Sequence, residues 1–293
     1  MVNTVAIIPA YNEQDSIADV ILRTEKNVDL IVVVDDGSWD SSGEIAKRLG
    51  AVVLRNDRNL GYGGALIRGF EYAKNINADF IVTLDADSQH DGSEIPLLLN
   101  RLREENVDIV IGSRFIRGGS SKAPAWRKWG ISFINNLSQT SSKISDSQSG
   151  FRAYTNKAIN SLDLKEMGMG ISTEILLKAD LAGLKIAEVP IHVTYNGKTS
   201  THNPVKHGLD VIISTLKTMS LNQPIKVYGL PGGLALVVSL FFWILTFSQY
   251  FKTGILWSNA ALLAIGTTMV GLLLLCTAVI LWAITNKNSE KNN

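Results

Sequence analysis

The chain has 293 residues, a net charge of +1 at pH 7 and one cysteine. This length allows one large domain or two smaller ones, and the near-zero charge gives no reason to expect a nucleic-acid partner. Because Cys276 is the single cysteine and lies in an apolar run, no intrachain disulfide can form, which suits a reducing compartment for the polar part of the chain. The first residues carry no basic segment ahead of a long apolar core, so no cleavable signal peptide is expected.

Short apolar, β-branched runs alternate with helical stretches through the first two thirds of the chain. In chain order the pattern predicts a strand over 5–8, a helix over about 14–26, strands over 30–34 and 52–54 with a helix over about 41–49 between them, a helix over about 64–75 and a strand over 78–84. It then predicts a strand over 107–111, a helix over 171–181 and a strand over 185–189. Such alternation builds a mainly parallel sheet with helices on both faces, so the fold class is α/β.

Two long stretches near the end of the chain, Val227–Phe251 and Thr253–Asn286, hold no charged residue. Each exceeds the roughly 20 residues needed to cross a bilayer, and aromatic residues gather mostly near their ends. The alternative is a buried hairpin of core helices. The flanking lysines are Lys217 and Lys226 before the first stretch, Lys287 and Lys291 after the second, and Lys252 alone between them. By the positive-inside rule, both ends and the polar part of the chain are expected in the cytoplasm.

An acidic motif follows the apolar strand over 78–84. Asp85 and Asp87 fall where this strand gives way to a loop, and Gln89 comes two residues later. Ligands of open α/β sheets sit outside the carboxyl ends of strands, and these three side chains offer only oxygen ligands. They favour Mg²⁺ or Mn²⁺ over zinc, with open positions for substrate phosphates. The alternative is a solvated acidic turn.

Three further segments lie at strand ends. Pro9-Ala10-Tyr11-Asn12-Glu13 opens the first helix and could meet a base or ribose, or could simply be a helix start capped by Asn12 or Asp15. The second strand likewise ends in acidic residues followed by a glycine turn, Val34-Asp35-Asp36-Gly37-Ser38, although Asp-Gly-Ser is also common in ordinary turns. The loop Asn59–Ala65 does not match the dinucleotide fingerprint, and its glycines, Gly63 among them, are expected to let the backbone approach the nucleotide or the metal loop.

Five motifs in order carry a family resemblance: Pro9–Glu13, Asp35–Ser38, Asp85–Gln89, Gly112-Ser113-Arg114 and Ser149-Gly150-Phe151-Arg152. Together they resemble the family 2 glycosyltransferases with a GT-A fold. The two trailing apolar stretches narrow the resemblance to the polyprenol-phosphate sugar synthases, of which dolichol-phosphate mannose synthase is the best-known type. The resemblance covers about residues 4 to 200.

The resemblance implies roles for individual residues. The residues expected around the nucleotide are Pro9, Ala10, Tyr11, Glu13, Asp35, Asp36, Gly63 and Asp85. The residues expected to hold the metal are Asp87 and Gln89. The acceptor phosphate is expected at Arg114, with Arg127 or Lys128 as a second cation and with Arg152 and Lys198 as further contacts; Tyr195–Lys198 is similar to a lid-like loop. Asp146 resembles a carboxylate near the reacting centre, orienting sugar hydroxyls or Arg152, with proton abstraction as an alternative. Glu174 is either a functional carboxylate or a favourable charge in a first helical turn.

The implied reaction is an inverting, metal-dependent transfer of one hexose to dolichyl or polyprenyl phosphate at the cytoplasmic membrane face. GDP-mannose and UDP-glucose are the leading donors, with UDP-N-acetylglucosamine behind them. The Gln-x-x-Arg-Trp motif of processive synthases does not occur, which favours a single transfer. The rival functions are transfer to a lipid alcohol such as diacylglycerol, and a silent scaffold or carrier of lipid-linked sugar. A carrier would need more than two spans unless the chain forms a homo-oligomer, which stays open.

The predicted organisation has four parts. Residues 1–204 form the GT-A domain, 205–226 an amphipathic linker, 227–286 two transmembrane helices and 287–293 a short polar tail. The linker either lies in the headgroup plane of the bilayer or packs on the catalytic domain as an ordinary amphipathic helix.

Overall fold

The computed structural model describes residues 3–104, 107–116, 144–193, 220 and 224–290. The chain divides into two compact units, Met1–Thr215 and Leu216–Asn293. Their boundary falls inside the segment 205–226 that was predicted as a linker. Almost all of the predicted amphipathic helix lies outside the described residues, as do Arg127, Lys128, Lys198 and the lid-like loop.

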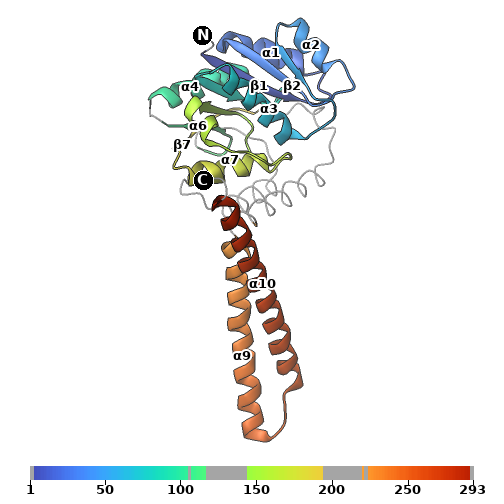
Figure 1. Ribbon diagram of the computed structural model, residues 1–293, viewed down its shortest axis with the longest axis vertical. Coiled ribbons are helices and arrows are strands. Elements are labelled where there is room, and N and C mark those ends of the chain that lie inside the picture. Colours follow the sequence, from blue (N-terminus) through green and yellow to red (C-terminus); the bar gives the residue numbers. More distant parts are fainter. Residues whose placement is uncertain (1–2, 105–106, 117–143, 194–219, 221–223, 291–293) are drawn as a thin grey trace. The chain divides into compact units, whose positions relative to one another are not determined.

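The first unit is built on one seven-stranded sheet (Figure 1). Its strands are β1 (Thr4–Ala10), β2 (Leu30–Asp35), β3 (Val52–Arg55), β4 (Phe80–Thr83), β5 (Ile109–Ser113), β6 (Arg152–Thr155) and β7 (Ile186–Pro190), in the order β3-β2-β1-β4-β6-β5-β7. All neighbouring strands pair in parallel except that β6 runs antiparallel to both β4 and β5. The predicted α/β class with a mainly parallel sheet is confirmed.

Helices cover both faces of the sheet, and alternate side chains of each central strand enter two separate cores. The helices are α1 (Ile17–Thr24) with the 3₁₀ turn η1 (Glu25–Asn27), α2 (Ser42–Arg48), α3 (Tyr62–Asn75), the 3₁₀ turn η2 (Gly92–Glu94) running into α4 (Ile95–Glu104), α6 (Asn156–Ser161) and α7 (Ile171–Leu181). In β1, Ile8 packs with α1 and α4, whereas Ile7 packs with α3 and α7. Burial on both faces explains why every residue of β1 is apolar or small.

Every strand predicted from the sequence is present, but among the described helices and strands α4, β6 and α6 were not predicted. β6 is four residues long and begins with an arginine, so it shows neither the length nor the apolar alternation of a typical strand. The first helix begins at Ile17, later than predicted. Asn12 has a left-handed backbone with φ of +57°, and the Ser16 and Ile17 amides donate to the Glu13 carbonyl in a turn ahead of the helix.

The second unit contains a hairpin of two long helices. A π-helical turn, η3 (Ile225–Gly229), leads into α9 (Leu230–Thr253), which packs against α10 (Ser258–Glu290). Lys252 lies in the last turn of α9, and not in the connecting loop as predicted. The helices approach closely where Gly232 faces Gly271, and the Ser239 hydroxyl donates to the Ala264 carbonyl at 3.0 Å. Small residues and buried hydroxyls of this kind are typical of helix pairs in membranes.

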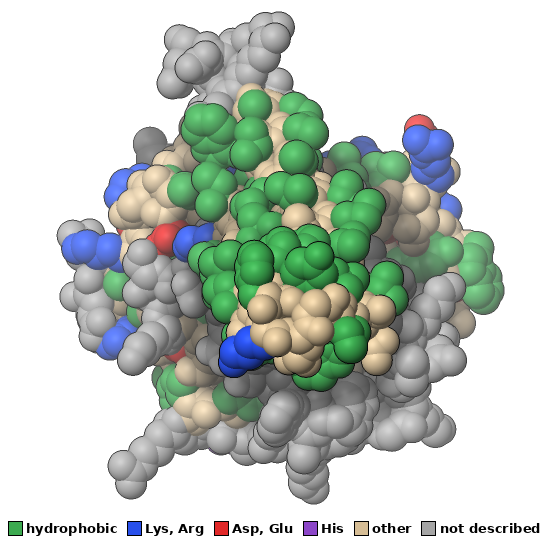
Figure 2. Space-filling model, turned by 90° about the horizontal axis from the view of Figure 1, so that it is seen from below, with side chains coloured by type: hydrophobic (Ala, Val, Ile, Leu, Met, Phe, Trp, Pro, Cys, Tyr) green, Lys and Arg blue, Asp and Glu red, His purple; other side chains and the backbone are tan. Residues whose placement is uncertain are grey.

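The outside of this hairpin is hydrophobic, as the view from below shows (Figure 2). The segments Ile225–Thr253 and Ser258–Thr285 are long and apolar enough to cross a membrane by length and composition. In each, only 17% of the most apolar window is buried. A hairpin of core helices, the alternative reading, would instead bury most of these side chains.

Gly69 provides a test of how α3 packs on the sheet. A Cβ at this position would lie 2.4 Å from Cγ2 of Ile7, which is fully buried and has no room to move. We expect Gly69→Ala to destabilise the protein by about 1–3 kcal/mol through overpacking. The measurement is the midpoint of thermal unfolding of the full chain in detergent. Glu71→Ala, an exposed change on the same helix, is the control, and equal midpoints for the two variants would contradict the close contact.

Candidate active site

The predicted motifs meet at the carboxyl edge of the parallel strands. β1 leads into Tyr11–Glu13, β2 ends at Asp35, β4 is followed by Asp85, and β5 by Arg114. Because parallel strands end at the same edge of a sheet, segments far apart in the sequence are brought together there.

The carboxylate of Asp85 is surrounded by three segments of the chain. The Tyr62 hydroxyl donates to Oδ1 of Asp85 at 2.9 Å, and Nδ1 of His90 lies 3.6 Å from Oδ2. A Cβ on Gly150 would lie 2.5 Å from Oδ1 of Asp85, so a larger residue at this position would displace the carboxylate. Gly150 is held in place by the Thr83 hydroxyl, which donates to its carbonyl at 2.7 Å.

Negative charge is concentrated on this edge. The pKa of Asp87 is raised above its usual value, mainly by burial and to a smaller extent by the nearby charge of Asp85. Burial also raises the pKa of Glu13, and the charges of Asp87 and Asp85 add to the effect. His90 offers no compensation at neutral pH, because burial lowers its pKa to about 4. An acidic group that is crowded in this way fits a bound cation.

The donor set also fits a hard divalent ion. Oδ1 of Asp87 accepts a hydrogen bond from the backbone amide of Gln89 at 3.0 Å. The left-handed backbone of Ser88, with φ of +58°, makes this bond possible. Within the described residues, no group of three His, Cys, Asp or Glu side chains is close enough to form a metal site alone. A cation here would therefore be held by Asp87 and the Gln89 amide oxygen, with other positions filled by substrate or water.

A second cluster pairs Arg114 with Asp146. Arg114 donates to both carboxylate oxygens of Asp146, from Nε and from one terminal nitrogen, each at 2.7 Å, and its backbone amide donates to Oδ2 at 3.0 Å. The Glu188 carboxylate on β7 accepts from the amides of Ser145 and Asp146 at 2.9 and 3.0 Å. Asp146 thus orients Arg114, and the prediction that it orients Arg152 is wrong.

Arg152 is fully buried, in contrast to the predicted contact with a phosphate. Its guanidinium donates to the carbonyls of Ser149, Ser147 and Ser172 at 2.8, 2.6 and 3.2 Å. These three bonds hold the turn that carries Asp146 and Gly150. Arg152 therefore supports the site by holding the backbone of this turn in place.

Asp35 and Asp36 are likewise buried and bound within the protein. Asp36 accepts from Asn56 Nδ2 at 2.7 Å and from the amides of Leu60 and Gly61 at 2.9 and 2.8 Å. Asp35 accepts from the Ser38 amide at 2.8 Å. Both carboxylates shape the loops around the site, and their contact with a nucleotide stays a prediction.

The glycine loop packs against a segment that the sequence did not indicate. A Cβ on Gly63 would lie 2.1 Å from the Glu166 carbonyl oxygen, and the Gly64 amide donates to the Met167 carbonyl at 3.1 Å. Gly63 therefore admits the chain at 166–168, and its approach to a nucleotide or to the metal loop stays a prediction. Glu174 holds the same chain, because its carboxylate accepts from the amides of Lys165 and Glu166.

The segment after β1 keeps the predicted placement. Pro9 and Ala10 are buried in the strand, Tyr11 is 39% exposed, and Glu13 is part-buried. The Asn12 amide donates to the Ser38 hydroxyl at 3.0 Å, which ties this segment to the loop after β2. Tyr11 and Glu13 thus remain available to a ligand at this edge.

Sequence reasoning missed three residues of the site: Tyr62, His90 and Glu188. Two of them stand inside motifs that were noticed, Tyr62 in the glycine loop and His90 directly after Gln89. The pKa of Tyr62 is raised well above its usual value of 10, mainly by burial and to a smaller extent by the charge of Asp85. Its hydroxyl therefore keeps its proton and stays a hydrogen-bond donor. No sequence signal marks Glu188, which became relevant only through the pairing of β7 with β5.

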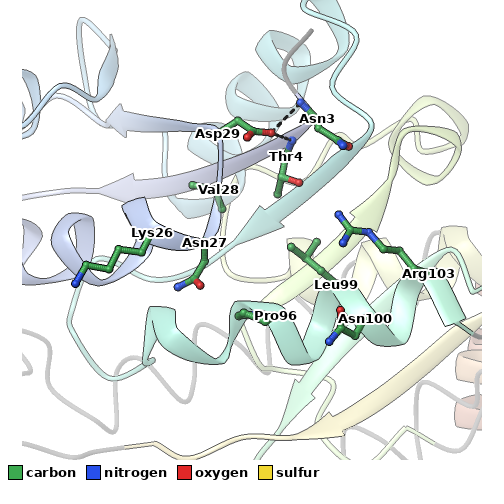
Figure 3. A pocket seen from close by; sticks show the side chains of 10 residues that line it. All are labelled: Asn3, Thr4, Lys26, Asn27, Val28, Asp29, Pro96, Leu99, Asn100 and Arg103. Atoms are coloured by element: carbon green, nitrogen blue, oxygen red, sulfur yellow. Dashed lines mark hydrogen bonds between the residues drawn. The ribbon is translucent and has the colours of Figure 1, made fainter.

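A cavity of about 390 Å³ lies elsewhere (Figure 3). Asn3 and Thr4 at the start of β1, residues around η1, and α4 line it, and the Asp29 carboxylate accepts from the Asn3 and Thr4 amides at 3.0 and 2.8 Å. β1 begins at this end and finishes at the other edge, so the cavity is separate from the acidic site.

An α/β sheet with one antiparallel strand and an acidic Asp-x-Asp segment after its central strand defines a glycosyltransferase domain of the GT-A fold. Residues 5–163 match the model of Glycosyl transferase family 2, and the chain belongs to this family. The chain is 32% identical over 231 residues to the UDP-N-acetylglucosamine–dolichyl-phosphate N-acetylglucosaminyltransferase of Methanococcus voltae, covering 71% of this chain and 90% of that one.

Two other comparisons agree with this family. The chain is 30% identical over 208 residues to the polyprenol monophosphomannose synthase of Mycolicibacterium smegmatis, covering 65% of this chain and 77% of that one. Glucosyl-3-phosphoglycerate synthase from Mycobacterium tuberculosis, solved with Mn²⁺, UDP and glucosyl-3-phosphoglycerate, shares the fold: it superposes with a TM-score of 0.60 at 22% identity, covering 74% of this chain and 80% of that one. The predicted GT-A fold and glycosyltransferase class are confirmed.

The buried position of Arg152 leads to a prediction. Arg152→Lys keeps the charge but cannot supply all three hydrogen bonds, so we expect a loss of about 2–4 kcal/mol of stability. The midpoint of thermal unfolding without ligands measures this, with Arg23→Lys at an exposed ion pair as control. An unchanged midpoint together with a raised KM for the acceptor would instead support the phosphate contact.

The crowding of carboxylates leads to a second prediction. A raised pKa means that the folded state disfavours the charged form of Asp87, so Asp87→Asn should raise stability in metal-free buffer by less than about 1 kcal/mol. The same variant should lose sugar transfer. Thermal unfolding in the presence of a chelator tests the first point, with exposed Asp57→Asn as control. A lower midpoint for Asp87→Asn than for wild type would show that the carboxylate is compensated in the protein.

Proposed function

We propose that this glycosyltransferase moves a single hexose from a nucleotide sugar to a polyprenyl phosphate at the cytoplasmic face of a membrane. The observation that carries the proposal is that an acidic cluster (Glu13, Asp85 and Asp87) and the Arg114–Asp146 ion pair lie at the same edge of the sheet. His90 interacts electrostatically with both groups, because the charges of Asp87, Arg114 and Asp146 all affect its pKa. The acidic cluster forms a donor half of the site that suits a metal-bound diphosphate, and the ion pair forms an acceptor half that suits a phosphate monoester.

The donor half consists of Tyr11, Glu13, Asp85, Asp87 and Gln89. Mg²⁺ or Mn²⁺ held by Asp87 and Gln89 would neutralise the charge that grows on the leaving diphosphate, a contribution of several kcal/mol. Tyr11 has an exposed ring suited to a base or ribose. Asp85, oriented by Tyr62, faces the nucleotide or the sugar.

The acceptor half is Arg114 with its partner Asp146. A phosphate monoester has a second pKa near about 6, so at neutral pH the nucleophile is largely ionised and requires no strong base. Arg114 receives this anion, and Asp146 fixes the guanidinium plane in advance. This arrangement leaves no need for Glu174 as a base, and its carboxylate is occupied by backbone amides. Arg127 and Lys198 are proposed as further cations at the phosphate.

Direct attack of the phosphate on the sugar displaces the nucleotide from the opposite face and inverts the anomeric configuration. The α9–α10 hairpin supplies the membrane anchor, and the lysines at its ends favour the cytoplasmic side for the catalytic unit. The names of the relatives support a lipid phosphate acceptor, while they include more than one sugar. GDP-mannose, UDP-glucose and UDP-N-acetylglucosamine are therefore all candidate donors.

The test is sugar transfer by membranes containing the protein, with each labelled donor in turn and with Mg²⁺ or Mn²⁺. Polyprenyl phosphate and diacylglycerol are supplied in parallel. We expect chelator-sensitive label in the lipid phase with one donor and with polyprenyl phosphate alone. Asp87→Ala should lower this transfer by about a hundredfold or more, while Asp57→Ala should leave it unchanged.

Two outcomes would contradict the proposal. Label on diacylglycerol alone would assign a lipid alcohol as the acceptor, and a general base would then have to be found. Absence of label from every donor, with the protein inserted in the membrane, would favour the silent scaffold or carrier.

A further inference from the structure

We propose that Glu94 is a positioning residue for the cation of the donor complex. Its carboxylate binds His192 and so holds the segment Ile191–Val193, and the loop that carries Asp87 and Gln89 is paired with this segment. This inference rests on the proposed function and deepens it, because it assigns a role to a residue outside both the donor half and the acceptor half of the site.

The segment Ile191–Val193 follows β7 and connects the two halves. Its first amide donates to the Ser113 carbonyl at 3.1 Å, directly before Arg114 in the chain. Its last residue forms an antiparallel bridge with His90, directly after Gln89. The segment therefore contacts the residue before the proposed phosphate contact and the residue after the proposed metal ligand.

The middle residue of this segment, His192, is bound by Glu94. The His192 backbone amide donates to the carboxylate, with 3.1 Å to Oε2, and Nδ1 of the ring lies 2.7 Å from Oε1. The flanking side chains of Ile191 and Val193 are buried in the core, whereas the His192 ring points outward. Because apolar packing is not directional, the two contacts with Glu94 add a restraint on where the segment lies along its own axis.

A short turn joins Glu94 to the loop that carries the proposed metal ligands. Asp91 accepts at Oδ1 from the Ser93 amide at 3.0 Å, and its carbonyl accepts from the Glu94 amide at 3.0 Å, which forms η2. The loop is thus attached to the segment Ile191–Val193 at two points, His90 and Glu94. Two attachment points fix its orientation as well as its position.

The placement of Gln89 depends on these attachments, because it lies directly before the first of them. Without the second attachment at Glu94, the chain around Gln89 would gain freedom to move, and the cation would have to order it on binding. Partners outside the metal's own ligands commonly change metal affinity by about 10- to 100-fold. Because Glu94 acts through the backbone of the loop, the effect should lie near the smaller of these values.

The experiment compares Glu94→Ala with wild type as full chains in detergent. Mn²⁺ binding is followed by electron paramagnetic resonance in the presence of UDP or GDP, and thermal unfolding is recorded without metal. We expect Glu94→Ala to raise the Kd for Mn²⁺ by about tenfold. Glu44→Ala is the matched control, because it removes an exposed carboxylate from the first turn of α2, and it should leave the Kd unchanged.

Glu94→Gln separates position from charge, since a carboxylate near a cation also attracts it directly. The glutamine oxygen can accept from the His192 amide, and its NH₂ group can donate to Nδ1 when the ring proton is on Nε2. We therefore expect Glu94→Gln to bind Mn²⁺ with nearly wild-type affinity. Equal losses in Glu94→Ala and Glu94→Gln would assign the effect to charge and overturn the positioning role.

His192→Ala tests the same contact from the other side. It removes the ring contact and keeps the backbone bond, and the fold should be retained because the side chain is 65% exposed. We expect the Kd for Mn²⁺ to rise by about threefold. An unchanged Kd in this variant would overturn the proposal even if Glu94→Ala does not fold.

Further outcomes separate this inference from the proposed function. Wild type that binds Mn²⁺ with a nucleotide, together with Glu94→Ala of equal affinity, would overturn the role of Glu94 alone. Wild type that binds no Mn²⁺ with either nucleotide would overturn both this role and the metal of the proposed function. A lower unfolding midpoint for Glu94→Ala with unchanged Mn²⁺ affinity would assign the carboxylate to folding and likewise reject the proposal.

Discussion

The antiparallel pairing of β6 with both β4 and β5 is the constraint on which the candidate site depends. β6 separates two strands that would otherwise be neighbours, and its register places Arg152 opposite Thr83 on one side and Ile111 on the other. The turn that enters β6 therefore crosses the carboxyl edge of the sheet, bringing Gly150 against Asp85 and Asp146 against Arg114. The Asp85 cluster and the Arg114–Asp146 pair are thus joined by a single turn of chain.

Charge in this protein is distributed in two ways. The buried side chains of Asp36, Glu174 and Arg152 form hydrogen bonds with backbone groups and so hold loops in place. Asp87 and Glu13, in contrast, sit where burial and mutual repulsion raise their pKa values. Groups left in an unfavourable state of this kind are typical of functional sites, where an expected ligand supplies the missing compensation.

The sequence predicted the parallel strands well, because buried strands are continuous apolar runs, and it placed the acidic motif at the end of a strand, where ligands of such sheets gather. It failed for β6, whose four residues carry no periodic signal, and for α4. Among the site residues, side-chain type alone did not distinguish Arg114, which stands beside the site, from Arg152, which lies beneath it. The backbone at Gly63 was predicted to lie close to the nucleotide or the metal loop. The segment that it contacts in the structure is 166–168, about a hundred residues away in the chain, which no local pattern could indicate.

The contact between Gly63 and the chain at Glu166 also bears on how the protein assembles. The glycine loop, the metal loop and the first four strands lie within about the first third of the sequence, yet the surface that locks the glycine loop comes from 166–168, and Glu188 comes later still. Contacts between such distant residues form late, because the intervening chain must be closed into a loop before they stabilise anything. During synthesis, the early strands would therefore emerge from the ribosome as a sheet with an unfinished edge, and the candidate site would become complete only when α7 and β7 have been made.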